Sequence, residues 1–575
     1  MSDTLLYVAI DFGTAYSGYC VKSNAPGKGS QFRDTEWGAE YGIRSCKTPT
    51  CIMFDSDGHF QCFGYAAMKK YTNKASLQGN EYFFSNFKME LYKNTDINRD
   101  SELTAFNGEK MAAMTVFAES LRYLKDHALL KIKNYSEAIQ LQESDITWVL
   151  TVPAIWSNAA KEFMRKAAIQ AGLVTESKPE RLMLALEPEA ASVYCKQLPT
   201  DGFVGGEEET MRLDQSSGTQ YIVADCGGGT IDITVHEVID AKKVKEVYKV
   251  SGNDLGGQNI DRELKSFLQQ IFGDECWKDY EKNHAPELQK FMFDFASAKC
   301  ADENEGISFP CSYNLTEIVK KHRGEDIASL FQGINGATWN DGSIDIEPAK
   351  FRSFFDESFR GIAKILKEIM KRAELHIEYL LLVGGYASSK ILQDYIKGQF
   401  GRKCKVMCPL HPQEAVMVGA VEFGMQPEVV MSRICGLTYA IAVGQRFDES
   451  KHKTEKKFFS SDGVAYCDDR FERLVKREES VGYNETKSHI YNAINFDQES
   501  MIFRFFSTTR LSAEYVDEWG IDQIGSMTVP MPIISGGTNR QVRLDVRFGS
   551  TEITATATDL TSDETDTVII NFMRK

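Results

Sequence analysis

The chain of 575 residues is 42% hydrophobic and 26% charged, and its formal net charge is −16. This composition is typical of a soluble globular protein with several domains, and the acidic charge argues against nucleic acid or an anionic membrane surface as the main partner. The chain has no apolar run long enough to cross a bilayer and no signal-peptide pattern, so we expect no membrane insertion. The 13 cysteines are scattered without a CxxC pair, which predicts free thiols in the cytoplasm, with the nucleus as an alternative location.

The first predicted element is a strand, a glycine turn and a returning strand. Residues 7–10 are mostly apolar, Asp11 follows them, and Gly13 and Thr14 form a turn before residues 17–21 return. The Asp-Phe-Gly sequence in this turn also occurs in protein kinases. The chain has neither an HRD sequence nor a GxGxxG loop to support that function.

The next stretch predicts helices and strands of a mixed fold. We expect a helix over 112–131, a strand over 146–152, and a second helix that begins near Asn158 and ends at Gly172. The apolar segment that follows ends at Glu187, and a charge inside such a segment needs either backbone donors or a function.

A second unit of the first kind begins with the apolar residues 221–224. Asp225 follows them, and Gly227 to Thr230 form a turn before another strand. The consecutive glycines let backbone N–H groups approach a phosphate, and Asp225 and Asp232 beside it require a hydrated cation such as Mg²⁺. A glycine-rich hairpin turn would explain this stretch alone equally well. Its similarity to the unit around Asp11 favours two related halves that face a shared phosphate.

A glycine pair marks a third stretch with a ligand-binding pattern. Residues 380–383 predict a buried strand, and Gly384 and Gly385 follow it at the start of a helix. Such a pair lets a nucleobase or ribose lie against the backbone, although an ordinary strand-to-helix turn has the same pattern. Between the second hairpin and this pair we expect a tight turn at 252–257 and a mobile insertion at 323–342.

The pattern changes after Gly424. Short strands alternate with clusters of glycine, aspartate and proline, which predicts a small all-β domain. Residues 510–534 have no regular pattern, and we expect no helical lid after the strands.

Together these stretches resemble one known family. The segments IDFGTAYSG, DCGGGTIDIT, LALEPEAA and LLLVGGYASS are similar to the two phosphate loops, the Glu-Pro segment and the adenosine loop of the seventy-kilodalton heat-shock proteins, which belong to the actin-like ATPase superfamily. Their order and spacing agree over roughly residues 5–425. The segments NFKMEL and LTYAIAVGQRF resemble most the divergent type-12 branch of this family.

The resemblance implies an α/β fold with two parts. A two-lobed actin-like ATPase domain with duplicated ribonuclease-H-like halves is expected at residues 1–425, its lobes dividing near residue 200. A linker at 426–433 and a β-rich domain for substrates or partners at 434–575 would follow. The linker lacks the Asp-Leu-Leu-Leu sequence that docks in typical members, so their allostery cannot be carried over from the family alone.

The resemblance also implies the residues of the site. Lys88, Glu187 and Asp225 are expected to be catalytic, and Lys88 would neutralise charge on the transferring phosphoryl group, although most lysines are simply solvated. Mg²⁺ is expected at Asp11, Asp225 and Asp232, mainly through water, with K⁺ as a further candidate cation. The expected contacts of ATP or ADP are Asp11, Gly13, Thr14, Ala15, Tyr16, Gly227, Gly228, Gly229, Thr230, Gly256, Gly257, Lys299, Gly384, Gly385 and Tyr386.

The implied function is that of an atypical chaperone. Its nucleotide state would control the binding of protein clients or partners, and nucleotide-exchange co-chaperones would be further partners. Ala15 stands where the family carries a second threonine, and the loss of one polar contact can slow a reaction about tenfold to a thousandfold. A slow Mg-dependent ATPase is therefore the first hypothesis, and a nucleotide-gated scaffold with little or no hydrolysis is the alternative. A sugar or small-molecule kinase is disfavoured, because we find no convincing sugar site.

Overall fold

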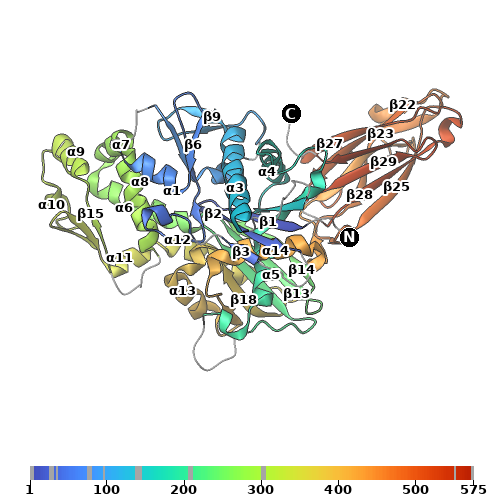
Figure 1. The fold of residues 1–575 in the computed structure, drawn as a ribbon. Helices are drawn as coiled ribbons and strands as arrows, with labels where there is room; N and C mark the ends of the chain where they lie inside the picture. Colours follow the sequence, from blue (N-terminus) through green and yellow to red (C-terminus); the bar gives the residue numbers. More distant parts are fainter. Residues whose placement is uncertain are drawn as a thin grey trace.

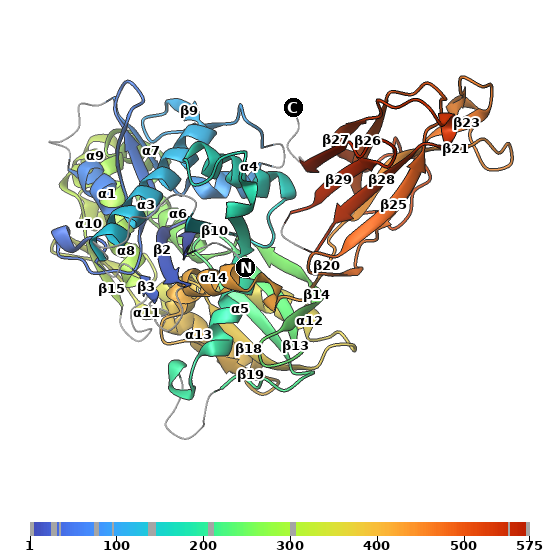
Figure 2. The ribbon, with the colours of Figure 1, turned by 45° about the vertical axis from the view of Figure 1, so that its right-hand side comes forward.

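The computed structural model describes residues 5–24, 31–33, 36–73, 80–94, 97–135, 145–204, 212–299, 306–549 and 552–570. The chain forms a two-lobed α/β body, and an elongated β-region extends from one side of it (Figures 1 and 2). Within the described residues, no helix combines the length and the apolar character needed to pass through a lipid bilayer. The cysteines among them are all free of disulfides.

The first lobe is built on a sheet around the N-terminal hairpin. Its strands are β1 (Leu6–Phe12), β2 (Tyr16–Ser23), β3 (Gln31–Arg33), β4 (Thr48–Pro49), β10 (Ile146–Val152) and β11 (Leu182–Leu186). Their order is β11-β10-β1-β2-β3, and β4 also pairs with β2. β2 runs antiparallel to β1 with Asp11 opposite Gly18, whereas β10 runs parallel to β1. All seven residues of β10 are buried, as expected for a central strand covered on both faces.

Helices cover the outer side of this sheet. α3 (Ala113–Tyr135) and α4 (Asn158–Gln170) pack their buried residues against the sheet, and the Ser157 hydroxyl caps α4 by accepting the Ala160 N–H at 3.2 Å. These helices agree with the sequence pattern. The remaining elements of this lobe are β5 (Cys51–Phe54), β6 (Phe60–Phe63), α1 (Tyr65–Thr72), β7 (Tyr82–Ser85), α2 (Glu90–Lys93), β8 (Glu102–Thr104) and β9 (Lys110–Ala112).

The second lobe repeats the arrangement of the first. Its strands are β12 (Gln220–Cys226), β13 (Ile231–Val238), β14 (Val244–Asn253), β18 (Ile377–Val383) and β19 (Lys405–Met407), in the order β14-β13-β12-β18-β19. β12 and β13 form the antiparallel hairpin, and Asp225 faces Asp232 across it. β18 runs parallel to β12, as β10 runs parallel to β1. This repeat confirms the predicted α/β fold with duplicated halves.

Two helices fill the space between the two sheets. α5 (Glu187–Gln197) and α14 (Ala415–Met425) cross so closely that a Cβ on Gly419 would lie 1.7 Å from the carbonyl oxygen of Ala190. Only glycine fits at this crossing. Their buried residues form one core with the inner faces of both sheets. The start of α5 therefore lies where the two lobes meet.

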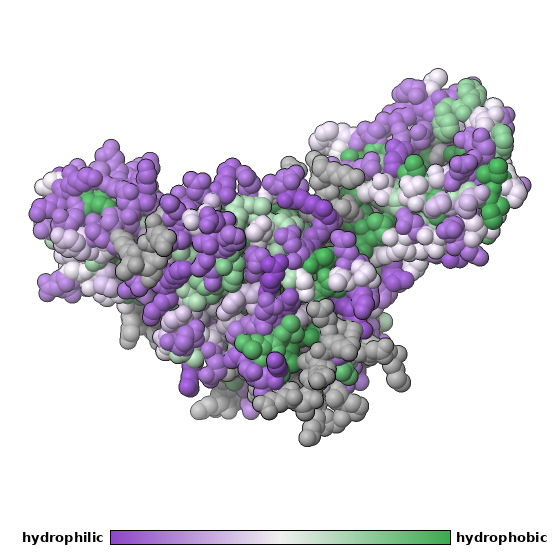
Figure 3. All heavy atoms as spheres, turned by 45° about the horizontal axis from the view of Figure 1, so that its top comes forward, coloured by the Kyte–Doolittle hydropathy of each residue, from purple (hydrophilic) through white to green (hydrophobic). Residues whose placement is uncertain are grey.

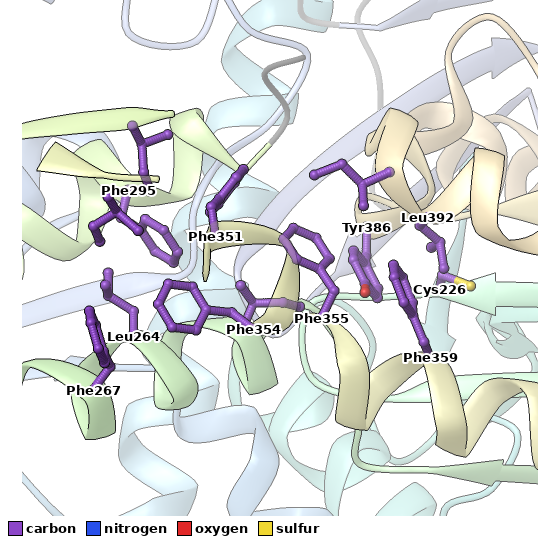
Figure 4. Packing of buried hydrophobic residues seen from close by; sticks show 14 of the residues in the cluster. Cys226, Leu264, Phe267, Phe295, Phe351, Phe354, Phe355, Phe359, Tyr386 and Leu392 are labelled. Carbon is purple, nitrogen blue, oxygen red and sulfur yellow. The ribbon is translucent and has the colours of Figure 1, made fainter. Parts of the chain in front are cut away.

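A second core fills the outer part of the second lobe. Figure 4 shows Phe351, Phe355 and Tyr386 among the side chains packed there. Residues 323–342, predicted to be a mobile insertion, are instead folded, and Ile327 is buried in this core. The elements of this part are α6 (Gly257–Phe272), α7 (Asp274–Asn283), α8 (Ala285–Ala298), β15 (Ile307–Pro310), α9 (Tyr313–Arg323), α10 (Ile327–Leu330), β16 (Ala337–Asn340), β17 (Ser343–Ile346), α11 (Pro348–Ser353), α12 (Asp356–Ile369) and α13 (Lys390–Phe400).

The β-region consists of two larger sheets around a core of its own. One sheet has the order β22-β23-β21-β26-β27, from β21 (Thr438–Arg446), β22 (Lys457–Phe459), β23 (Ala465–Val475), β26 (Ser500–Thr508) and β27 (Ile521–Pro530). The other has the order β25-β28-β29-β30, from β25 (Thr486–Asn492), β28 (Gln541–Arg547), β29 (Thr554–Asp559) and β30 (Thr565–Ile569). Their inward residues share one hydrophobic cluster. The expectation that residues 510–534 are irregular holds for 510–520 and 531–534 but is wrong for β27, which pairs along its length with β26.

The chain between body and β-region is held at both ends. Val430 is fully buried and bridges to Val244 of β14, and the Met431 N–H donates to the Val244 carbonyl at 2.8 Å. The next residues form β20 (Ser432–Ile434), which pairs with β24 (Ser480–Gly482) of the β-region. Figure 2 shows β20 beside β14. The junction therefore joins the edge of the second lobe's sheet to the β-region.

Buried side chains reinforce this junction. The Arg433 guanidinium donates to both carboxylate oxygens of Glu189 on α5, at 2.7 and 2.8 Å, and both residues are buried. Arg165 on α4 makes a second two-pronged pair with Glu552 of the β-region. Further hydrogen bonds across the junction run from Asn158 to the Tyr439 hydroxyl at 3.0 Å and from the Ile434 N–H to Glu246 at 3.1 Å.

Candidate functional site

The turns of the two hairpins meet in the middle of the body. A Cβ on Gly228 would lie only 2.9 Å from the Cβ of Ala15, so the second turn touches the first. Thr50 fixes the first turn, because its N–H donates to the Ala15 carbonyl at 2.8 Å and its hydroxyl to the Gly13 carbonyl at 2.7 Å. The backbones of both turns are thus held in place beside each other.

A cavity of about 850 Å³ opens over these turns. This volume is typical of a small-molecule site. The predicted residues that line it are Asp11, Gly13, Thr14, Ala15, Tyr16, Lys88, Glu187, Asp225, Gly227, Gly228, Gly229, Thr230, Gly257, Lys299, Gly384, Gly385 and Tyr386. The structure therefore gathers residues from seven separate stretches of the chain around one space.

Two predicted residues do not line the cavity. Gly256 lies behind the second turn, where a Cβ would come within 2.7 Å of the Gly227 carbonyl oxygen. Asp232 lies beneath the turn, and its two oxygens accept the Ile155 N–H at 2.8 Å and the Thr230 hydroxyl at 3.1 Å. Asp232 therefore supports the turn through Thr230.

Lys88 and Glu187 form a buried ion pair in the cavity wall. Lys88 Nζ lies 2.7 Å from Glu187 Oε1 and 5.0 Å from the centroid of the Trp156 ring. Lys88 comes from the short turn after β7, and Glu187 is the first residue of α5. Burial, which outweighs the attraction of Lys88, raises the pKa of Glu187 to about 7. The carboxyl can therefore exchange a proton near neutral pH.

The pKa values of both aspartates of the second hairpin are raised. Burial, then repulsion from Glu187, Asp232 and Asp11, raises the pKa of Asp225 well above its usual range. Burial likewise raises the pKa of Asp232 to about 6. Carboxyl groups that crowd in this way at a cavity fit a divalent cation such as Mg²⁺.

Lys47 adds a cation that the sequence analysis missed. Its Nζ lies 2.5 Å from Oδ2 of Asp11, and the Thr151 hydroxyl donates to Oδ1 of the same carboxylate at 3.0 Å. Burial disfavours the charge on Lys47, but the attraction of Asp11 outweighs it and raises the lysine pKa. Lys47 lies in a turn-rich stretch without a motif, so only the folded structure brings it to the site.

The start of α6 closes the second turn from behind and also reaches the first lobe. The N–H groups of Gly257 and Gln258 donate to the carbonyls of Gly227 and Gly228 at 3.0 and 2.8 Å. The Gln258 side chain donates to Asn86 Oδ1 at 2.6 Å. Asn86 stands two residues before Lys88, so this bond ties the second turn to the segment that carries the lysine. Neither partner was predicted.

At the wall formed by Gly385 and Tyr386, mainly backbone atoms face the cavity. A Cβ on Gly385 would meet nothing within 4 Å, so the backbone lies bare toward the cavity. The Tyr386 ring turns away into the core and stacks on Phe355 at 6.3 Å between centroids (Figure 4). Lys299 is held at the wall by Asp261 at 2.6 Å and by the Gly257 carbonyl at 3.0 Å.

Comparison with known proteins settles the family. A model of the Hsp70 protein family matches residues 47–456. The chain belongs to the Hsp70 family. Heat shock 70 kDa protein 12A of Mus musculus is 30% identical over 99% of this chain and 92% of its own length, and the Homo sapiens protein of that name gives the same figures. Heat shock 70 kDa protein 12B of Homo sapiens is 30% identical over 98% of this chain and 91% of its own length. The resemblance to the type-12 branch is thereby confirmed.

Hsp70 membership implies the binding of ATP or ADP with Mg²⁺, and this chain is an atypical Hsp70-like ATP-binding protein. Its residues fit that ligand, since the two glycine turns line the cavity, Gly385 leaves backbone open to it, and the crowded carboxyls suit a cation. Asp11 and Asp225 would hold the metal through water. A bound magnesium ion would supply positive charge against the phosphates.

Proposed function

We propose that the protein is a slow Mg-dependent ATPase of the chaperone type, in which the nucleotide state of the cavity controls the binding of protein clients or partners. The single observation that carries the proposal is the pair of Lys88 and Glu187. Both groups line the cavity beside the phosphate turns, and their 2.7 Å contact fixes each relative to the other.

In this proposal Glu187 and Lys88 serve the attack of water on the terminal phosphate. Glu187 accepts a hydrogen bond from the water and takes its proton as the new oxygen–phosphorus bond forms and the bond to ADP breaks. Lys88 places its charge against the oxygens of the transferring phosphoryl group. Thr14 and the N–H groups of the glycine turns hold the phosphates in line.

The β-region is the proposed site for clients and partners. It exposes large apolar side chains, among them Trp519 at 92% and Ile502 at 62%. Figure 3 shows apolar side chains on the surface of this region. Exposed apolar groups of this kind suit extended apolar segments of another protein. Nucleotide-exchange co-chaperones would act on the body, where opening of the two lobes releases nucleotide.

A nucleotide-gated scaffold is the second candidate, and Ala15 is the observation that favours it. Ala15 lines the cavity in contact with the second turn, yet its side chain offers no hydroxyl to a phosphate. The site would then bind ATP tightly and hydrolyse it little, and the bound nucleotide itself would be the signal.

Single-turnover ATP hydrolysis with Mg²⁺, together with nucleotide affinity, tests the proposal in the full chain. Lys88→Ala should bind nucleotide and lose hydrolysis, while Lys22→Ala, which lies outside the cavity, should behave as wild type. Tight binding without hydrolysis in wild type would refute the ATPase and favour the nucleotide-gated scaffold. No binding would refute both, and a phosphorylated small molecule among the products would indicate a kinase.

A further inference from the structure

Lys47 is a charged group of the cavity wall that neither the motifs nor the proposed function uses. It precedes β4 in the first lobe, lines the cavity, and places Nζ 2.5 Å from Asp11. Its side chain is 12% exposed and that of Asp11 5%. The stem is fixed as well, since a Cβ on Gly18 would lie 3.0 Å from Lys47 Cγ. Because Gly18 has no side chain, the lysine stem has space to lie against it.

The phosphate end of the cavity, beside the two glycine turns, combines buried carboxyls with buried lysines. The buried carboxyls there are Asp11, Glu187, Asp225 and Asp232. Lys47 is paired with Asp11, and Lys88 is paired with Glu187. The two remaining carboxyls belong to the second hairpin: Asp225 lines the cavity, where a divalent cation would suit it, and Asp232 lies beneath the turn within reach of the charges of Lys88 and Lys161. Without Lys47, Asp11 would lose the positive charge that is paired with it.

We propose that the Lys47 ammonium is a built-in monovalent cation of the nucleotide site, which occupies the place beside Asp11 that a dissolved K⁺ would otherwise take. The proposal rests on the proposed nucleotide binding at this cavity. An ammonium carries the same single charge as K⁺ and has three N–H donors, of which one meets Asp11. The others can meet phosphate oxygens or bound water. Because Lys47 is tethered to the chain, its occupancy does not vary with the salt around the protein, and nucleotide needs Mg²⁺ alone.

Calorimetric titration with ADP and constant Mg²⁺ tests this inference in the full chain. The titration is run at equal ionic strength in KCl, NaCl and choline chloride. Wild type should show the same affinity in all three salts. Lys47→Met removes the charge but keeps the length of the stem. In choline chloride it should bind ADP about tenfold or more weakly, the loss of one charge-assisted hydrogen bond, and KCl should restore most of the affinity.

Lys22→Met is the matched control. Lys22 also makes a 2.5 Å ion pair, with Glu422, but does not line the cavity, so this variant should bind as wild type in every salt. If Lys47→Met lacks a native circular dichroism spectrum, Lys47→Gln replaces it.

Three results would overturn the inference. They are a wild-type affinity that requires K⁺, a Lys47 variant that binds as wild type in choline chloride, and a Lys47 variant that KCl does not rescue. Failure of the nucleotide site itself looks different, because wild type would then bind ADP in none of the salts.

Discussion

Arg433 and Glu189 lie 244 residues apart in the chain and are joined by two hydrogen bonds of 2.7 and 2.8 Å. Glu189 stands one residue after Pro188 and two after Glu187, on the first turn of α5. One helix start therefore contacts the cavity through Glu187 and the junction through Glu189. A ligand that displaced this turn would also move the carboxylate to which Arg433 is bonded. The turn therefore connects the two parts of the molecule physically.

Loss of Arg433 should release the β-region from the body. Arg433→Met leaves Glu189 buried without its partner, a change that typically costs about 3–5 kcal/mol. We expect faster proteolysis near residues 426–433 and an increase in the radius of gyration by X-ray scattering. Arg543→Met removes a surface pair with Asp545 and is the control, with an expected effect within about 0.5 kcal/mol. Equal behaviour of the two variants would show that the buried pair does not hold the junction.

Docking of the β-region should weaken as the pH rises from 6 to about 8.5. Burial, then the charge of Glu189, raises the pKa of Glu246 to about 8, while Arg433 and Lys161 oppose this shift. After release, Glu246 would be exposed with its ordinary pKa near 4.5. The docked form thus binds the proton more tightly, and its advantage is complete below pH 4.5 and is lost as the pH rises through 8. X-ray scattering across this range measures the change, and Glu246→Gln should abolish it; an unaltered pH profile in that variant would assign the effect elsewhere.

Alanine at two glycine positions of the site should affect stability and ADP affinity differently. Gly256→Ala places a Cβ within 2.7 Å of the second turn's backbone, so the variant should lose both thermal stability and ADP affinity. Gly385→Ala meets no protein atom within 4 Å and should keep its melting temperature while binding ADP more weakly. Gly398→Ala on α13, with equally open surroundings, should be neutral or slightly stabilised. Undiminished ADP binding by Gly385→Ala would mean that no ligand approaches that backbone.

A hydroxyl at position 15 should speed hydrolysis. Ala15→Ser restores one polar group to the first turn, and an increase of about tenfold in the single-turnover rate is expected, with little change in affinity. Ala15→Cys has nearly the same size without a strong donor and should stay at the wild-type rate. Equal rates for all three proteins would show that Ala15 does not limit the chemistry.

The parts of the site that the sequence predicts are those in which neighbouring residues act together. Asp11 with Gly13, and Asp225 with Gly227 to Gly229, each form a strand end and turn within a few residues, so pattern alone places them. Lys47 and Arg433 were missed because their partners, Asp11 and Glu189, are far away in the chain. Pairing of this kind is decided by packing and leaves no local signal.

The errors in the fold have a related cause. In β27 the buried residues Ile524, Met527 and Val529 do not alternate, because the pairing with β26 shifts its register beside Gly525. A strand with a bulge loses the period of two from which strands are recognised. The four-residue elements α10 and β16 are too short to show any period, so residues 323–342 resembled an insertion.

The junction also covers a sheet edge on which another molecule could pair. β14 is the outermost strand of the second lobe's sheet, and Val430 and Met431 cover part of its open edge. Release of the β-region would uncover N–H and C=O groups on which an extended segment of another molecule can align. Every opening of the junction would thus expose this edge to self-association, and the fraction of time spent open would set how often such pairing can begin.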